Sequence, residues 1–168
     1  GVTQSGETAE TIKALEYAKS KGAKTISVTE KNISQASIIS DTNVNIGCGP
    51  EYAVASTKTF TATALTLYII SVYLSRDNEN KKNLENNLLG LDSKIESLLL
   101  DTKDTKEIAK ILSSKEHILY LGRGIMYPIA MEGALKMKEI CYIHSEGYAA
   151  GEMKHGVNAL IGDNMPSV

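Results

Sequence analysis

The segment at residues 3–8 carries hydroxyl and amide side chains where a helix is predicted to begin. It reads Thr-Gln-Ser-Gly-Glu-Thr and follows an apolar stub that is typical of a strand end. Ser5 is predicted to be the N-cap of this helix, and Gly22 to end it. A helix N-terminus presents unpaired N–H groups and the positive end of the helix dipole, so it favours an anion. The candidate phosphate ligands are Thr3, Gln4, Ser5 and Thr8.

The same segment has no lysine of the kind that a nucleotide phosphate-binding loop uses. A sugar phosphate is therefore favoured over a nucleotide, and a simple capped helix is the alternative that the pattern leaves open. The later turn Gly122-Arg123-Gly124 lacks the third glycine of a dinucleotide-binding turn, because Tyr127 stands at that position. A nicotinamide cofactor is not indicated.

A second candidate site lies on the predicted helix 127–141. Glu132, Lys136 and Glu139 are spaced by four and then three residues, which places them on one helix face. A solvated ladder of Glu and Lys explains this spacing without any function. The alternative is a carboxylate base whose proton transfer is tuned by a neighbouring ammonium group.

Histidines in the glycine-rich segment after this helix are further candidates for proton transfer. An imidazole titrates near neutral pH, so His144 and His155 could serve as acid or base. They stand eleven residues apart with no third ligand at metal-like spacing, and no metal site is predicted. His117 begins a predicted strand and is interpreted as structural.

The elements that must position these residues form two strand–turn–helix units, at 2–22 and 118–141. Helices between and around them suggest a duplicated α/β fold with a parallel sheet. A spacing of four, three, four and three residues predicts one amphipathic helix that packs against its own domain, a coiled coil being the alternative; it joins Leu84, Leu88, Leu91, Ile95 and Leu98. The other predicted elements are strands at 23–28, 44–46 and 117–121, helices at 33–39, 57–75 (largely buried) and 105–114, and an exposed connection at 76–83.

Composition limits the function classes. The chain has 168 residues and a formal net charge of −2, so no broad basic surface for nucleic acid is expected. The longest apolar run, 62–74, is too short and polar for a bilayer, and no signal peptide is visible. Two widely separated cysteines indicate a reducing compartment, and a cytoplasmic protein is predicted. Because the first residue is not methionine, we expect the chain to be a piece of a larger protein.

Seven motifs occur in order along the chain. They are Ser-Gly-Glu-Thr at 5–8, Val-Ala-Ser-Thr-Lys at 54–58, Leu-Gly-Arg-Gly at 121–124, Glu-Gly-Ala-Leu-Lys at 132–136, Lys-Glu-Ile at 138–140, Tyr-Ile-His at 142–144 and Gly-Glu-Met-Lys-His-Gly at 151–156. With this set the chain resembles the isomerase half of the glutamine–fructose-6-phosphate aminotransferases, which is built from two sugar-isomerase (SIS) subdomains. This resemblance implies an α/β parallel-sheet sandwich of the SIS type, with the end of a first subdomain at 1–76, a helical connection at 77–104 and the start of a second at 105–168.

The resemblance also implies a role for each matching residue. Glu139 would move a proton between C1 and C2 of the substrate imine, and Lys136 would assist it. His155 would open the sugar ring, reaching the active site of a neighbouring subunit in a homodimer. The backbone of Val54 would lie against the sugar, and the substrate phosphate would be held by Thr3 (a serine in most of the family), Gln4, Ser5 and Thr8. Val157 stands where a proline is common, which leaves the geometry after His155 less defined.

The implied reaction converts fructose 6-phosphate and ammonia to glucosamine 6-phosphate without a metal or organic cofactor. The ammonia would come from glutamine in a glutaminase domain of the same full-length chain. That domain and the family's C-terminal lysine lie outside residues 1–168, so we expect little synthase activity from this piece alone. Two rival functions are a non-catalytic sugar-phosphate-binding or regulatory SIS module and an SIS deglycase that splits a sugar phosphate from an amine.

Overall fold

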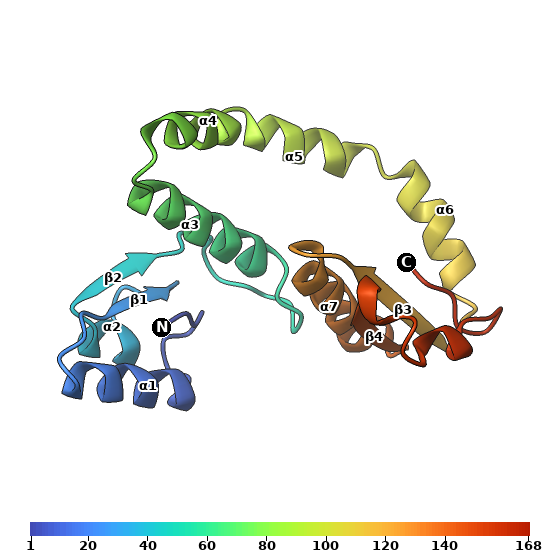
Figure 1. Ribbon diagram of the computed structural model, residues 1–168, viewed down its shortest axis with the longest axis horizontal. Helices are drawn as coiled ribbons and strands as arrows, with labels where there is room; N and C mark the ends of the chain where they lie inside the picture. The colour runs from blue at the N-terminus through green and yellow to red at the C-terminus, as the bar shows by residue number, and fades with distance from the viewer. The chain divides into compact units, whose positions relative to one another are not determined.

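The computed structural model describes residues 1–168 apart from the side chain of Asn78. The chain divides into two compact units, Gly1–Asn86 and Asn87–Val168, which run from blue to green and from green to red in Figure 1. The sequence-based subdomain boundaries at 76 and 104 stay a prediction.

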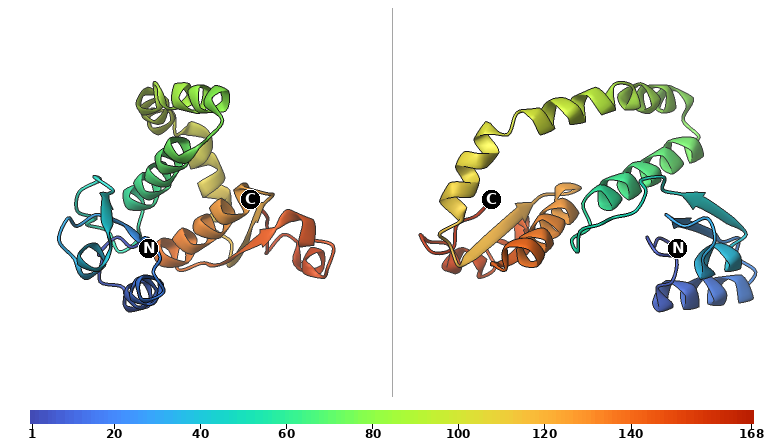
Figure 2. Two further views of the ribbon diagram at one scale, coloured as in Figure 1. Left: turned by 60° about the vertical axis from the view of Figure 1, so that its left-hand side comes forward. Right: turned by 180° about the vertical axis from the view of Figure 1, so that it is seen from behind.

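The first unit is built around two short parallel strands. Strands β1 (Ile26–Thr29) and β2 (Thr42–Asn45) pair in parallel, with Ile26 opposite Thr42. Val2 adds a parallel bridge on the other edge of β1, opposite Val28. Figures 1 and 2 show α1 and α2 on one side of these strands and α3 on the other. The helices are α1 (Ala9–Ser20), α2 (Gln35–Ile39), α3 (Lys58–Leu74) and α4 (Asn78–Leu88), which crosses into the second unit.

Polar side chains inside the first unit are satisfied by hydrogen bonds between neighbouring elements. The Asp41 carboxylate accepts from the backbone N–H of Thr25 at 2.9 Å and from the Thr25 hydroxyl at 3.1 Å. Lys19 of α1 lies 3.3 Å from the other oxygen of this carboxylate. These bonds, the Thr25 N–H first, lower the pKa of Asp41 to about 2. Asp41 therefore ties α1 to the start of both strands.

The second unit packs one helix across a second parallel pair. Strand β3 (His117–Gly122) pairs with β4 (His144–Ala149) on one edge, and Ser167 forms a parallel bridge with Leu119 on the other. Ile118 and Leu119 are fully buried between the sheet and its covering elements. The other elements are α5 (Leu91–Leu100), α6 (Lys103–Leu112), α7 (Met126–Lys136), a π-helical turn at Met137–Cys141, and single 3₁₀ turns at Ala150–Glu152 and Val157–Leu160.

Two glycines allow α7 to lie close to the strands. A Cβ on Gly147 of β4 would come within 2.6 Å of the Met131 backbone, and one on Gly133 would come within 2.9 Å of the Tyr120 ring. The buried Ser145 hydroxyl also donates to the carbonyl of Ala134 at 2.7 Å. The strand–turn–helix unit predicted at 118–141 is thereby confirmed.

The first helix begins later than predicted. Its N-cap is Thr8 and not Ser5, because Gly6 has a φ of +73° and interrupts the helical path. The predicted end is confirmed, since Gly22 follows the last turn with a φ of +80°. The strand predicted at 23–28 begins only at Ile26. Among the described helices, none combines the length and the apolar character that crossing a membrane requires.

The central helices differ most from the predictions. The polar segment 76–83, predicted as a connection, enters α4 at Asn78. The single amphipathic helix is broken, because Gly90 adopts a left-handed φ of 72° between α4 and α5. The break separates Leu84 and Leu88 in α4 from Leu91, Ile95 and Leu98 in α5, and Leu98 is 73% exposed rather than packed. Helix α3 was predicted to be largely buried, yet within the described structure its only buried residues are Thr59 and Val72.

Candidate functional site

The predicted phosphate ligands gather in one turn before α1. The hydroxyl oxygens of Thr3 and Thr8 lie 2.7 Å apart, and Thr3 is buried. The Ser5 hydroxyl accepts from the N–H of Glu7 at 3.1 Å. Because the Thr8 hydroxyl contacts Thr3, no side chain in the described structure caps the start of α1. The first-turn N–H groups of α1 can therefore be offered to an anion.

This turn is fastened to the start of α2. A Cβ on Gly6 would lie 2.0 Å from the Ser34 hydroxyl, so only glycine fits at this position. The carbonyl of Gly6 accepts from the N–H of Ala36 at 2.9 Å. The carboxylate of Glu7 accepts from the N–H of Gln35 at 3.1 Å. The turn is therefore attached to the start of α2 by a backbone hydrogen bond and by the Glu7 side chain.

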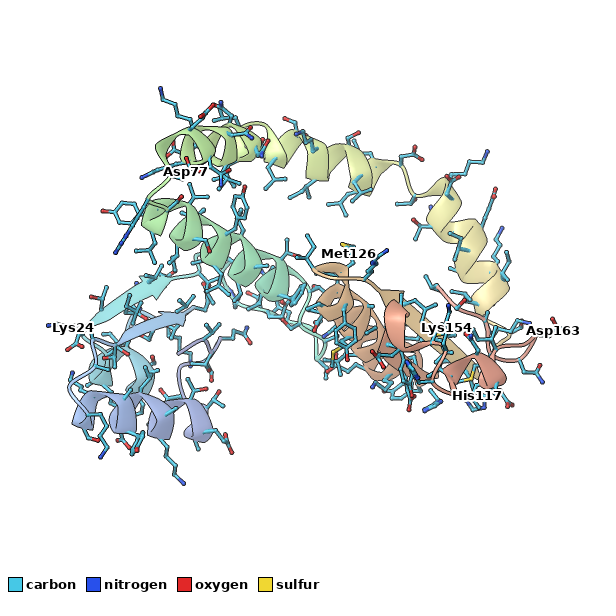
Figure 3. The ribbon with its side chains drawn as sticks, in the orientation of Figure 1. Lys24, Asp77, His117, Met126, Lys154 and Asp163 are labelled. Atoms are coloured by element: carbon cyan, nitrogen blue, oxygen red, sulfur yellow. The ribbon has the colours of Figure 1, made fainter. Side chains whose placement is uncertain are left out.

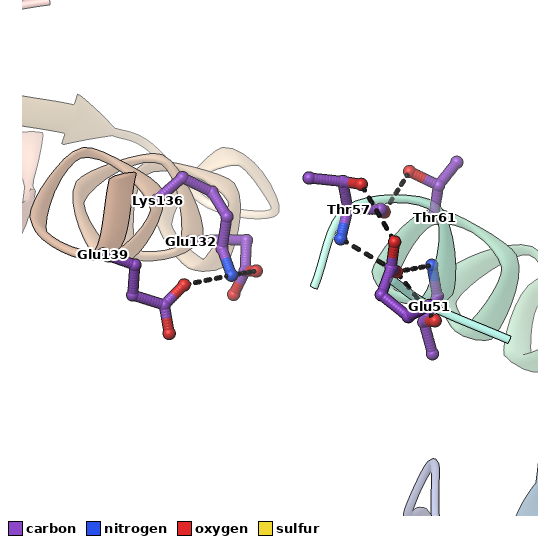
Figure 4. Close-up of polar contacts among 7 residues, drawn as sticks. Glu51, Thr57, Thr61, Glu132, Lys136 and Glu139 are labelled. Carbon is purple, nitrogen blue, oxygen red and sulfur yellow. Dashed lines mark hydrogen bonds and ion pairs between the residues drawn. The ribbon is translucent and has the colours of Figure 1, made fainter. Parts of the chain in front are cut away.

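Val54 lies on a loop that a carboxylate holds in place. Its side chain is 98% exposed, whereas Ala55 beside it is buried. The Glu51 carboxylate accepts from the N–H groups of Thr57 at 3.2 Å and Thr59 at 3.1 Å, and from the Thr59 hydroxyl at 2.9 Å (Figure 4). These bonds, the Thr59 N–H first, lower the pKa of Glu51 although desolvation opposes them.

Glu51 was not among the predicted site residues. A carboxylate that caps a helix is recognised in sequence by its position in the first turn or at the N-cap. Glu51 lies well before Lys58, the first residue of α3, so no capping pattern points to it. Only the folded loop brings its side chain back to the helix.

Glu132, Lys136 and Glu139 do share one face of α7 and the π turn. The Lys136 ammonium lies 3.2 Å from a Glu132 oxygen and 2.6 Å from a Glu139 oxygen (Figure 4). Desolvation acts to lower the pKa of Lys136, but its bonds to Glu139 and Glu132 outweigh this and raise it. Lys136 is therefore charged at neutral pH and cannot accept a proton. Of the pair, only the Glu139 carboxylate can act as a base.

Glu139 stands in the π-helical turn that ends α7. Such turns are rare in proteins overall, and many of those that occur lie at functional sites. The turn ends at Tyr142, which is not glycine but has a φ of 57°. A cavity of about 370 Å³ borders this turn on the side of Met137 and Cys141. Glu139 is partly exposed on another side of the turn, where a ligand can reach it.

His155 stands apart from this ion-pair cluster. It is exposed, and its N–H donates to the Glu152 carbonyl at 3.0 Å. Among the hydrogen bonds of the described residues, none joins its ring to Lys136 or Glu139. The predicted site residues thus fall into two groups. Thr3, Gln4, Ser5, Thr8 and Val54 belong to the first unit, and Lys136, Glu139 and His155 to the second.

His144 contacts another histidine instead of a candidate catalytic group. Its Nδ1 lies 3.1 Å from Nδ1 of His117, at the end of β3 remote from Met126 (Figure 3). Its Nε2 lies 3.5 Å from the Glu146 carboxylate, which also accepts from the Tyr148 hydroxyl at 2.7 Å. Within the part of the chain that the structure describes, no group of three or more side chains is arranged to hold a metal ion.

Comparison with known proteins matches both units of the chain. The SIS domain family model matches residues 1–72 and 111–168. The glutamine–fructose-6-phosphate aminotransferase (isomerizing) of Aquifex aeolicus is 48% identical over 168 residues, which is the whole chain and 28% of that protein. The corresponding enzyme of Photorhabdus laumondii is 45% identical over 173 residues, with 99% of this chain and 28% of the relative covered.

A solved structure supports the same relationship. The C-terminal domain of glucosamine-fructose-6-phosphate aminotransferase from Francisella tularensis superposes with a TM-score of 0.92 at 35% identity. The match covers 99% of this chain and 49% of that one. The chain thus has the length of about a quarter of the curated relatives that it matches.

Proposed function

Because the chain belongs to the SIS domain family, we propose that it is the sugar-phosphate isomerase part of an aminotransferase that forms glucosamine 6-phosphate. The substrates would be fructose 6-phosphate and ammonia. The proposal is supported by 48% identity over the whole chain with an isomerising aminotransferase. One structural observation carries it, the contact of 2.6 Å between the Lys136 ammonium and the Glu139 carboxylate.

Ketose-to-aldose isomerisation needs a base that removes a proton from C1 and returns it to C2. We assign this base to Glu139, because Lys136 holds its proton at neutral pH. The ammonium of Lys136 would orient the carboxylate and stabilise negative charge that develops on the enolamine. Glu132 holds the opposite side of the ammonium at 3.2 Å and so limits its movement.

The phosphate would be held by the turn at residues 3–8. The hydroxyls of Thr3, Ser5 and Thr8, the Gln4 amide and the N–H groups at the start of α1 offer donors of the kind that a phosphate accepts. Anchoring the phosphate orients the reacting carbons, which can supply several kcal/mol of barrier reduction. The Val54 backbone would contact the sugar, and His155 would open the ring, within a homodimer.

The remaining partners follow from the relatives. Ammonia would be released from glutamine by a glutaminase domain of the full-length protein, and the protein would act in the cytoplasm. The segments 1–76 and 105–168 would contribute to two SIS subdomains, joined by helices at 77–104. Residues 1–168 would have little synthase activity by themselves.

A chimera tests the assignment of Glu139. Residues 1–168 replace the matching segment of the Aquifex aeolicus enzyme, and Glu139→Gln is compared with Glu107→Gln, a matched change at an exposed glutamate of α6. We expect Glu139→Gln to lower the rate of glucosamine 6-phosphate formation at least about 100-fold. Binding of fructose 6-phosphate should change little, and Glu107→Gln should change neither quantity.

The same experiment separates the rival functions. If the parent chimera binds fructose 6-phosphate but makes no glucosamine 6-phosphate, a binding or regulatory module replaces the proposal. If it splits a sugar phosphate from an amine, identification of the products reveals a deglycase. Equal rates for the two glutamine variants would remove Glu139 from the mechanism.

A further inference from the structure

Two carboxylates that sequence analysis did not select hold the loop that carries Val54. At its start, Glu30 accepts from the N–H groups of Cys48 at 3.0 Å and Gly49 at 2.7 Å, and from the Cys48 thiol at 3.3 Å. At its end, Glu51 accepts from the N–H groups of Thr57 and Thr59. The exposed Val54 lies between these two anchors.

The same two residues reach the phosphate-binding turn through Gln4. The backbone N–H of Glu30 donates to the Gln4 carbonyl at 3.0 Å. The Gln4 side-chain amide lies 3.3 Å from the Thr59 hydroxyl, which donates in turn to Glu51 at 2.9 Å. Thr59 is only 3% exposed, so water competes little with these bonds. Gln4 in the turn is therefore hydrogen-bonded to Glu30 directly and to Glu51 through Thr59, and the carboxylates of Glu30 and Glu51 are hydrogen-bonded to the loop.

We propose that Glu51 and Glu30 are positioning residues. They hold the Val54 backbone and the Gln4 amide at the relative positions that let both contact one sugar phosphate. The inference rests on the proposed function, because it assigns these residues a part in the same site. A loop backbone can bind a sugar well only if it is fixed before binding, since its ordering otherwise reduces the affinity. Gly47 and Gly49 have positive φ values of 73° and 71°, so the loop needs such anchors.

Glu51 also determines which helix start can receive the phosphate. Its carboxylate already accepts from Thr57 N–H and Thr59 N–H at the start of α3, so this helix dipole faces an internal anion. The first turn of α1 includes Glu10, but in the described structure no side chain accepts a capping hydrogen bond at the start of this helix. A phosphate is thereby directed to the turn at residues 3–8 and not to α3.

Binding to the 168-residue chain tests this role. Calorimetry measures the Kd of fructose 6-phosphate and of inorganic phosphate for the wild type and Glu51→Ala, with Glu16→Ala, an exposed glutamate of α1, as the matched control. We expect Glu51→Ala to weaken fructose 6-phosphate binding at least about tenfold and phosphate binding about threefold or less. Thr59→Ala should weaken phosphate binding to the same extent as Glu51→Ala, because each variant removes support from the Gln4 amide. Thr59→Ser, which keeps the hydroxyl, should bind phosphate as the wild type does.

Amide hydrogen exchange without ligand supplies a second measurement. In Glu51→Ala the N–H groups of Thr57 and Thr59 should exchange at least about tenfold faster, while those of β1 remain unchanged. Unchanged exchange would overturn the anchoring. The Kd values are measured well below the melting temperature. If exchange is faster in Glu51→Ala but the ratio of its Kd values for fructose 6-phosphate and phosphate equals that of the wild type, Glu51 is a purely structural residue and the inference is overturned.

Failure of the proposed function and failure of the positioning role give different binding results. A wild-type chain that binds neither fructose 6-phosphate nor phosphate removes the sugar-phosphate site, and the positioning role with it. A wild type that binds both, with a Glu51→Ala variant that binds them equally well, overturns the positioning role alone.

Discussion

The two units use carboxylates in opposite ways. In the first, Glu30 and Glu51 accept from backbone N–H groups and from thiol or hydroxyl groups of the same loop, so both oxygens of each carboxylate hold that loop. In the second, Glu132 and Glu139 share one ammonium group, Lys136, and among the described residues the other oxygen of each carboxylate has no hydrogen-bond partner. A carboxylate whose two oxygens are both occupied by donors cannot accept a proton from a ligand unless those bonds break, whereas the second oxygen of Glu139 is available for one. The proposed function accordingly places binding in the first unit and proton transfer in the second.

Removing the shared cation should have the largest effect. In the chimera, Lys136→Met leaves Glu132 and Glu139, which contact the same ammonium, without the charge between them. We expect turnover to fall about 100-fold and the acid limb of the pH–rate profile to move to higher pH, because two neighbouring carboxylates resist joint ionisation. Lys138→Met is the control. An unshifted acid limb would contradict the assigned role of Lys136.

A smaller effect is expected from loosening the helix that carries the second cluster. Gly147→Ala places a Cβ against the Met131 backbone, where the available distance is 2.6 Å. We expect a loss of about 1–3 kcal/mol in the free energy of unfolding, measured by urea titration. Gly151→Ala is the matched control, because its added Cβ meets no atom within 4 Å. Equal stability of the two variants would show that α7 can move away from β4 at no cost.

The smallest effect concerns pH. The pKa of Asp41 is lowered from 3.8 to about 2, so its contribution to stability is present above pH 3.8 and is lost as the pH falls towards 2. The pKa of Lys136 is raised, so its contribution is present below 10.5 and is lost only at higher pH. Acid should therefore remove the contribution of Asp41 to the stability of the first unit. Urea titrations from pH 5 to about 2 should show a flatter decline for Asp41→Asn than for wild type.

Much of the local structure could be predicted from sequence. The helix face shared by Glu132, Lys136 and Glu139 follows from the 3.6-residue repeat, and strand β3 follows from its apolar run. Two predictions failed because one residue's backbone conformation decided the outcome. Gly6 delays α1 and Gly90 divides a helix that the leucine spacing made continuous, because both adopt positive φ.

The amino-acid sequence by itself determined the family, the parallel α/β units, and the turn and helix that carry the candidate ligands, because these depend on local patterns and motifs. Only the tertiary structure revealed that the carboxylates of Glu30 and Glu51 accept hydrogen bonds from the two ends of the loop that carries Val54. It also showed that the ring of His144, a candidate for proton transfer, contacts the ring of His117. The contact of Glu30 with Gly49 spans 19 positions, that of His117 with His144 spans 27, and those of Glu51 with Thr57 and Thr59 span six and eight. No local repeat encodes them, and they form only when the backbone between them is folded.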